Sequence, residues 1–153
     1  MCPSVPVAQP TSVTGSIGVI MYRVDVTGLM QKVGVQTVEI ASAEKKGIGS
    51  AFRTLSSEEK KIFQDFIDSL YTRFTGLVAE ERKLTPDNLR KMADGRIFTS
   101  VEAKAGGLID GVGYLEDAIE LAKKQANLPQ ARVVTYFRPG EYKDNIYSLS
   151  LIN

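Results

Sequence analysis

The sequence predicts an α/β fold in a single domain, and three observations lead to this prediction. The length of 153 residues suits one domain with one hydrophobic core. Apolar segments typical of buried strands alternate along the chain with helical patterns, as in the α/β class. The apolar fraction of 43% and the charged fraction of 24% are those of an ordinary globular protein. We expect one domain over residues 1–153, with residues 138–153 as a C-terminal arm.

The first predicted strand covers residues 14–24 (TGSIGVIMYRV), which are apolar almost without interruption. Such a run indicates a strand buried on both faces, as in parallel sheets. Residues 26–34 have the pattern of a short helix that Gly34 ends. Residues 35–42 then alternate as a second strand. Strand, short helix and strand together predict a right-handed βαβ unit.

The clearest predicted helix covers residues 55–84, where Ser56 and Glu59 form a capping box. Apolar side chains follow at helical spacing and give the helix one broad apolar face. They are Phe63, Phe66, Ile67, Leu70, Phe74, Leu77 and Val78. We interpret this face as core or subunit contact rather than as a cofactor site.

Shorter elements complete the pattern. A helix over residues 85–95 is indicated by Thr85 as its cap and Pro86 in its first turn. The further expected elements are a brief strand at 96–100, a helix of about one turn ending at Gly106 and Gly107, a short buried segment at 108–113, an amphipathic helix at 114–126 and a late strand at 131–137.

Composition excludes several classes of function. The chain contains no histidine, which rules out a Ser-His-Asp triad, a Cys-His pair and an imidazole metal site. Cys2 is the single cysteine, so neither an internal disulfide nor a thiolate zinc site can form. A net charge of +1 without a long basic run argues against nucleic-acid binding. We expect no metal and no cofactor, and the sequence contains no recognisable targeting or transmembrane segment.

General-base chemistry without histidine would require lysine, aspartate or glutamate. Lys45 and Lys46 lie side by side where the second predicted strand meets a glycine-containing turn. A free lysine, with a pKa of about 10.4, must lose its proton before it can activate a serine hydroxyl, and burial can achieve this. On the residues alone, a solvated turn is the more frequent explanation of such a pair. Ser16, between Gly15 and Ile17, would lie near this turn if the two predicted strands were neighbours in one sheet.

Three motifs together resemble a known family. PTSVTGSIGVIM, AEKKGIGSAFRTLSSEEK and ADGRIFTSVEAKAGGLIDGVG occur in this order from about Gln9 to about Phe137. In order and spacing they resemble the C-terminal half of the catalytic domain of signal peptide peptidase A (protease IV), among the S49 serine peptidases. The resemblance implies a partial ClpP/crotonase-type fold, a Ser-Lys dyad and hydrophobic or remnant signal-peptide substrates. It also implies homo-oligomers at the inner membrane of the bacterial cell envelope.

The resemblance also assigns roles to single residues. The family's lysine turn reads SGxxKDIGSPFR, and its alignment with SAEKKGIGSAFR puts the general base at Lys46. Lys45 then becomes a solvated neighbour. The serine that orients the lysine falls on Ser16. The chain departs from the family pattern at Ala43, Gly47, Ala51 and Ser100, where the family has glycine, an acid, proline and glycine.

The largest departure concerns the nucleophile. The family carries its nucleophilic serine and oxyanion-hole glycines in an SGGYY-like segment, which by spacing would fall just before Met1. Ser4 and Ser12 are the nearest serines, and neither has glycine neighbours that could supply oxyanion-hole amides. We therefore expect a fragment that lacks the N-terminal nucleophile-bearing portion and is inactive alone.

Two alternatives to a peptidase fragment are open. The chain could be a non-catalytic subunit that completes a site or binds peptides in an oligomer. An acyl-CoA enzyme of the related crotonase fold is the weakest alternative. Without the N-terminal half, the remaining part of the fold would expose a sheet edge and apolar surface. We therefore expect the chain to associate with itself or with a missing N-terminal half.

Overall fold

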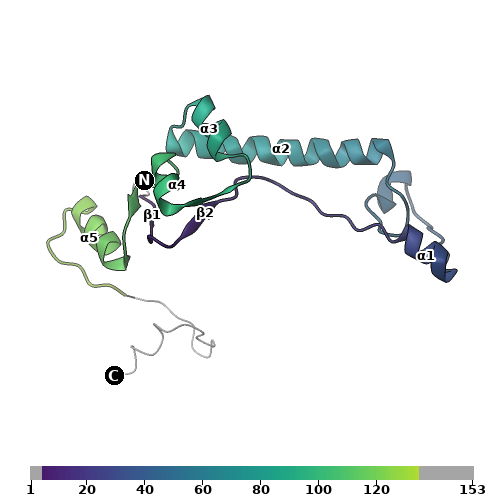
Figure 1. The fold of residues 1–153 in the computed structure, drawn as a ribbon, viewed down its shortest axis with the longest axis horizontal. Coiled ribbons are helices and arrows are strands. Elements are labelled where there is room, and N and C mark those ends of the chain that lie inside the picture. Colours follow the sequence, from purple (N-terminus) through teal and green to yellow (C-terminus); the bar gives the residue numbers. More distant parts are fainter. Residues whose placement is uncertain (1–4, 135–153) are drawn as a thin grey trace, which may run out of the picture. The chain divides into compact units, whose positions relative to one another are not determined.

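The structure, a computed structural model, describes residues 5–134 (Figure 1). The chain divides into two compact units, residues 1–114 and residues 115–153. Cys2, Ser4, the end of the predicted strand at 131–137 and the predicted arm at 138–153 lie outside the described residues.

Two small sheets form in the first unit. β1 (Val7–Ala8) pairs in parallel with β4 (Gly111–Val112). β2 (Val13–Gly15) pairs antiparallel with β3 (Ile97–Thr99), with Gly15 opposite Ile97. The predicted strand at 96–100 is thereby confirmed, whereas only the start of the segment at 14–24 is a strand.

The helix predictions are confirmed. The helices are α1 (Thr27–Val33), α2 (Ser57–Arg82), α3 (Pro86–Met92), α4 (Ser100–Ala105) and, in the second unit, α5 (Leu115–Gln125). The expected capping box begins α2, because the Ser56 hydroxyl accepts from the Glu59 N–H while the Glu59 carboxylate accepts from the Ser56 N–H. Gly34 ends α1 in the left-handed conformation, with φ 75°.

Most buried residues of the first unit lie where β2, β3, α3 and α4 meet. Ser100 and Ala103 of α4 are fully buried, and the Ser100 hydroxyl donates to the Pro10 carbonyl over 3.0 Å. The middle of α2 also contacts this region, because the Tyr71 hydroxyl donates to the Ala93 carbonyl over 2.6 Å. Ile17, just after β2, is also buried, with 6% of its surface exposed.

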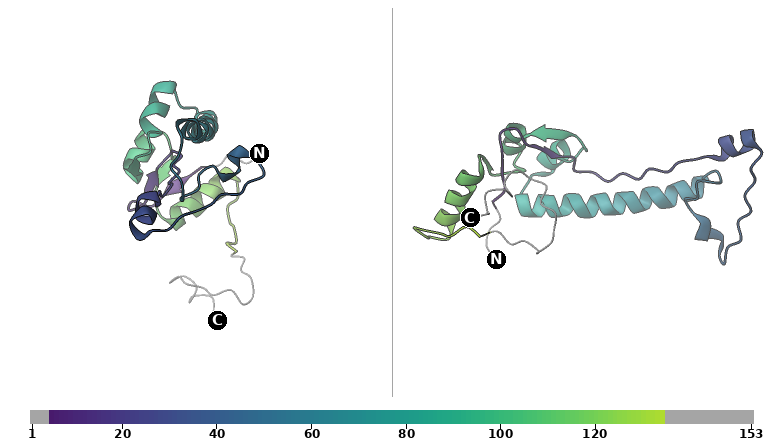
Figure 2. Two further views of the ribbon diagram at one scale, coloured as in Figure 1. Left: turned by 90° about the vertical axis from the view of Figure 1, so that its right-hand side faces the viewer. Right: turned by 90° about the horizontal axis from the view of Figure 1, so that it is seen from below.

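The structure does not contain the predicted βαβ unit. Residues 16–26 and 35–42 are extended, but neither segment pairs as a strand with another described segment. The first runs beside α2 (Figure 2), where Met21, Phe63 and Ile67 line a groove of about 350 Å³. A strand requires a neighbour that satisfies its backbone groups. The two segments with the apolar pattern are therefore extended but do not form a sheet.

Candidate active site at the lysine turn

The turn that carries the lysine pair folds through its own backbone hydrogen bonds. It contains a 3₁₀ helix, η1 (Glu44–Gly47), in which the Lys46 N–H donates to the Ala43 carbonyl over 3.0 Å. The Ser50 N–H donates to the Gly47 carbonyl over 3.1 Å. Gly49 adopts φ 81°, and a β-carbon there would lie 2.9 Å from Phe63 of α2. The left-handed backbone conformation therefore favours glycine at position 49, and the Phe63 ring would have to shift to admit a side chain there.

The two lysines have different surroundings in the structure. Lys45 forms an ion pair with Glu58 in the first turn of α2. The hydrogen bond and the charge of Glu58 raise the pKa of Lys45. A base must give up its proton near neutral pH, so the ion pair makes Lys45 the poorer candidate.

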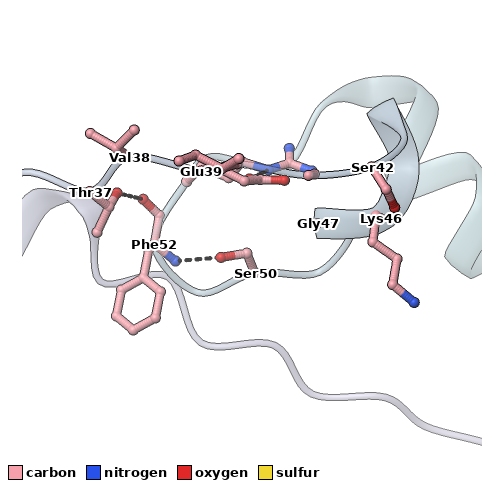
Figure 3. Close-up of a pocket in the computed structure, with 11 residues that line it drawn as sticks. Thr37, Val38, Glu39, Ser42, Lys46, Gly47, Ser50 and Phe52 are labelled. Atoms are coloured by element: carbon pink, nitrogen blue, oxygen red, sulfur yellow. Dashed lines mark hydrogen bonds and ion pairs between the residues drawn. The ribbon is translucent and has the colours of Figure 1, made fainter.

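Lys46 lies at the rim of a pocket of about 670 Å³ formed by residues 37–42, the turn and residues 50–53. The Thr37 hydroxyl, which donates to the Phe52 carbonyl over 3.5 Å, links the two walls (Figure 3). The Lys46 side chain is exposed, and its amine points away from Thr37 and Phe52. A catalytic lysine becomes neutral through burial. In the described part of the chain, the turn forms but the side chain of Lys46 is not buried.

A charged cluster that the sequence analysis missed supports the turn. The Arg53 guanidinium donates two hydrogen bonds to Glu59, one of them over 2.9 Å. Its Nε lies 3.2 Å from Glu39 Oε2. Glu59 is only 7% exposed, and Arg53 together with the Ser56 N–H lowers its pKa to about 2. The capping box predicted that Glu59 binds the N-cap residue Ser56. No sequence signal predicted that Glu59 also pairs with Arg53.

Ser16 occupies a different place. Its backbone is left-handed, with φ 52°, which is uncommon for a residue other than glycine, and its N–H donates to the Arg96 carbonyl over 2.8 Å. It lines a pocket of about 570 Å³ together with Tyr71 and Ala93. Backbone strain of this kind gathers at functional sites, so Ser16 stays a candidate.

The structure does not bring Ser16 and Lys46 into one pocket. The lysine turn contacts α2 at Glu58, whereas Ser16 lies near Tyr71 of the same helix. These two contact points are thirteen residues apart, or about 20 Å along a helix axis at roughly 1.5 Å per residue. The expected proximity depended on pairing between the two predicted strands, and that pairing does not form.

Ser12, the described serine nearest the N-terminus, lies in the turn between β1 and β2, where its N–H donates to the Gln9 carbonyl over 2.9 Å. Over residues 5–134, no three side chains of His, Cys, Asp or Glu come together as a metal-binding group. None of the helices in this range has the length and apolar character of a membrane-spanning helix.

Comparison with known proteins identifies the family. The family described as Peptidase family S49 matches residues 4–129. The chain belongs to this family. A relative from Enterococcus faecium, provisionally named signal peptide peptidase SppA, is 38% identical over 84% of this chain and 38% of its own length. Protease 4 of Salmonella typhi is 36% identical over 81% of this chain and 20% of its own length.

The family extends beyond bacteria. The chloroplastic serine protease SPPA of Arabidopsis thaliana is 35% identical over 84% of this chain and 19% of its own length. The chain spans less than half the length of the curated relatives that it matches. The mixture of helices and small sheets accords with an α/β fold.

Proposed function

We propose that this chain is the lysine-bearing part of a Ser-Lys serine endopeptidase of family S49, on a ClpP/crotonase-like fold. Lys46 is its general base, and Ser16 orients the lysine. The family match over residues 4–129 is the observation that carries the proposal. The structure adds that Lys45 is held in an ion pair, whereas Lys46 borders a pocket.

The chemistry assigns Lys46 two proton transfers. Its neutral amine takes the proton of a nucleophilic serine as that serine attacks the peptide carbonyl, and the resulting ammonium then protonates the leaving amine. Backbone N–H groups must stabilise the oxyanion between these steps. We place the serine and these N–H groups outside the present sequence, since no SGG segment occurs in it. The chain alone is then inactive.

The exposure of Lys46 indicates what assembly must accomplish. A general-base lysine acts from a buried position, and the Lys46 side chain is exposed, so another protein surface has to cover it. That surface belongs to the nucleophile-bearing half or to another subunit of a homo-oligomer. The same assembly would have to bring the hydroxyl of Ser16 close to Lys46.

A second candidate function is a non-catalytic subunit that completes a site or binds peptides in an oligomer. The separation of Ser16 from Lys46 favours it, because one described chain does not assemble both into one pocket. The extended segments also present apolar side chains to solvent, including Tyr22, Val38 and Ile40, which are 86%, 86% and 95% exposed. Such surface is typical of interaction sites.

Hydrophobic peptides, including remnant signal peptides, are the proposed substrates, and the bacterial cell envelope is the proposed location. Val38, Ile40 and Phe52 line the pocket beside Lys46 and would offer apolar contacts to such a peptide. The names of the relatives in Enterococcus and Salmonella agree with a peptidase of this kind.

The test joins this chain to the nucleophile-bearing half of a relative and measures hydrolysis of a hydrophobic fluorogenic peptide. Lys46→Ala should lower kcat by about 10²–10⁴-fold, the usual contribution of a general base. Lys45→Ala is the matched control and should leave kcat nearly unchanged. Equal effects of the two substitutions would contradict the assignment.

A second arm distinguishes the two candidate functions. The chain alone should show no hydrolysis. Supplying the nucleophile-bearing half as a separate polypeptide should restore hydrolysis if the lysine is lent to another subunit. Restoration only by covalent fusion would favour the fragment of an ordinary peptidase.

A further inference from the structure

Arg53 joins the lysine turn to the first turn of α2. Its guanidinium binds the Glu59 carboxylate through two nitrogens, the geometry that makes arginine–carboxylate pairs strong and directional. The Glu59 carboxylate also accepts from the Ser56 N–H over 3.0 Å, so the helix cap fixes it in place. Arg53 is thereby paired with a buried carboxylate that the helix cap also binds.

The same guanidinium reaches Glu39 in the extended segment on the other side of the turn, with Nε 3.2 Å from Oε2. The Glu39 carboxylate lies directly against the backbone at Gly47, the residue after Lys46. A methyl group on Gly47 would collide with that carboxylate. Glu39 therefore contacts both Arg53 and the backbone next to the lysine.

Arg23 holds the backbone of this region from a third direction. Its Nη2 donates to the carbonyls of Ser50 and Arg53. The Val26 N–H donates to the Ala51 carbonyl over 3.0 Å. Residues 50–53 are thus fixed through their backbone, while the side chain of Arg53 fixes the turn to α2 and to Glu39.

We propose that Arg53 is a positioning residue for Lys46: by joining Glu59 to Glu39, it holds the turn that presents the lysine. This proposal rests on the proposed function only for the importance of Lys46. The clamp itself, defined as Glu39, Arg53 and Glu59, is a property of the turn that can be measured without any hydrolysis.

The first experiment measures hydrogen exchange of the amides of Lys46, Ile48 and Ser50 in the full chain. Arg53→Ala should accelerate their exchange by about tenfold or more, because loss of the clamp permits local opening of the turn. Amides of α4 serve as an internal reference. Lys61→Ala is the matched control, since it breaks the exposed Lys61–Asp65 pair on the same helix without touching the turn.

Two further variants test the geometry. Arg53→Lys retains the charge but cannot bind Glu59 through two nitrogens and Glu39 together, so its exchange should fall between wild type and Arg53→Ala. Gly47→Ala should displace Glu39 and accelerate exchange in the turn, while the capped first turn of α2 keeps its protection. Unchanged exchange of the turn in Arg53→Ala, or equal acceleration in α4, would overturn the clamp.

The second experiment uses the fused peptidase of the function test. Arg53→Ala should lower kcat with little change in KM, and Arg53→Lys should restore part of kcat. If Lys46→Ala abolishes hydrolysis and Arg53→Ala leaves kcat unchanged, the positioning role is wrong although the proposed function stands. If Lys46→Ala leaves hydrolysis intact, the proposed function fails, and the exchange measurement still decides whether the clamp exists.

Discussion

Two regions of the first unit place their apolar residues in very different environments. The region around α4 is packed: Ala93 and Ala103 are 1% and 0% exposed. Beyond Ile17, the extended segments at 16–26 and 35–42 leave most of their apolar side chains exposed to solvent. The packed region obtains its partners from α3, β2 and β3 of the same chain, whereas the extended segments have no partner strand among the described residues. Apolar composition therefore predicts that a segment needs to be buried, but it does not predict which segment will cover it.

The exposure of two isoleucines shows this difference. Ile17, at the entrance to the first extended segment, is 6% exposed, whereas Ile40 in the second is 95% exposed. The sequence analysis predicted both in strands, Ile17 in a strand buried on both faces and Ile40 in an alternating second strand. The same substitution at the two positions therefore measures how strongly each region is packed.

The largest effect is expected for Ile17→Ala. Removing a buried isoleucine costs the transfer free energy of the lost carbons and leaves a cavity, so the free energy of unfolding should fall by about 2–4 kcal/mol. Urea unfolding followed by circular dichroism would measure this. A loss below about 0.5 kcal/mol, the size usual at exposed sites, would show that the packed region does not hold Ile17 in solution.

The second largest effect is expected at the cap of α2, a helix whose first turn is stabilised by neighbouring residues. Ser56→Ala removes the hydroxyl that accepts from the Glu59 N–H, and a lost cap of this kind costs about 1 kcal/mol. Ser57→Ala is the matched control, because Ser57 is the first residue of α2 rather than its cap. Urea unfolding should separate the two variants. Equal losses would contradict the capping box.

The acid dependence of stability tests the clamp that joins the turn to α2. The pKa of Glu59 is lowered from 4.5 to about 2, first by the hydrogen bond from Arg53. Its ionised form therefore contributes stability that is complete above pH 4.5 and is lost as the pH falls from there toward 2. Glu59→Gln, which can keep the capping box, should lose less stability than wild type over this interval. Parallel acid curves for both proteins would contradict the pairing.

The sequence predicted the local structure of this chain well and its tertiary partners poorly. Helices α1 to α5 satisfy their backbone groups internally, and their ends are marked by residues such as Ser56, Thr85 and Gly34. Strands need a second segment, so the pattern at 35–42 could not reveal that no described strand would pair with it. The family motif assigned a role to Lys46, but spacing along the chain did not place it relative to Ser16.

Within the candidate site, too, the sequence could not predict contacts between segments that lie far apart along the chain. Two sets of contacts depend on how the turn lies against α2. They are the ion pair of Lys45 with Glu58 and the contacts of Arg53 with Glu39 and Glu59. No short-range pattern encodes that arrangement. The roles of Lys46 and Ser16 stay predictions.

The smallest effect is expected for Ile40→Ala, the counterpart of Ile17→Ala. A side chain that is 95% exposed contributes little to the folded chain, so the free energy of unfolding should change by less than about 0.5 kcal/mol in dilute solution. The effect should appear instead in association: sedimentation velocity at increasing protein concentration should show weaker association for Ile40→Asp than for wild type. If Ile40→Ala destabilises the dilute chain as much as Ile17→Ala does, the segment at 35–42 is packed against this chain in solution, and the contrast between the two regions fails. If stability is unchanged and association weakens, the segment acts as an interaction surface, because its apolar side chains are buried only by a partner.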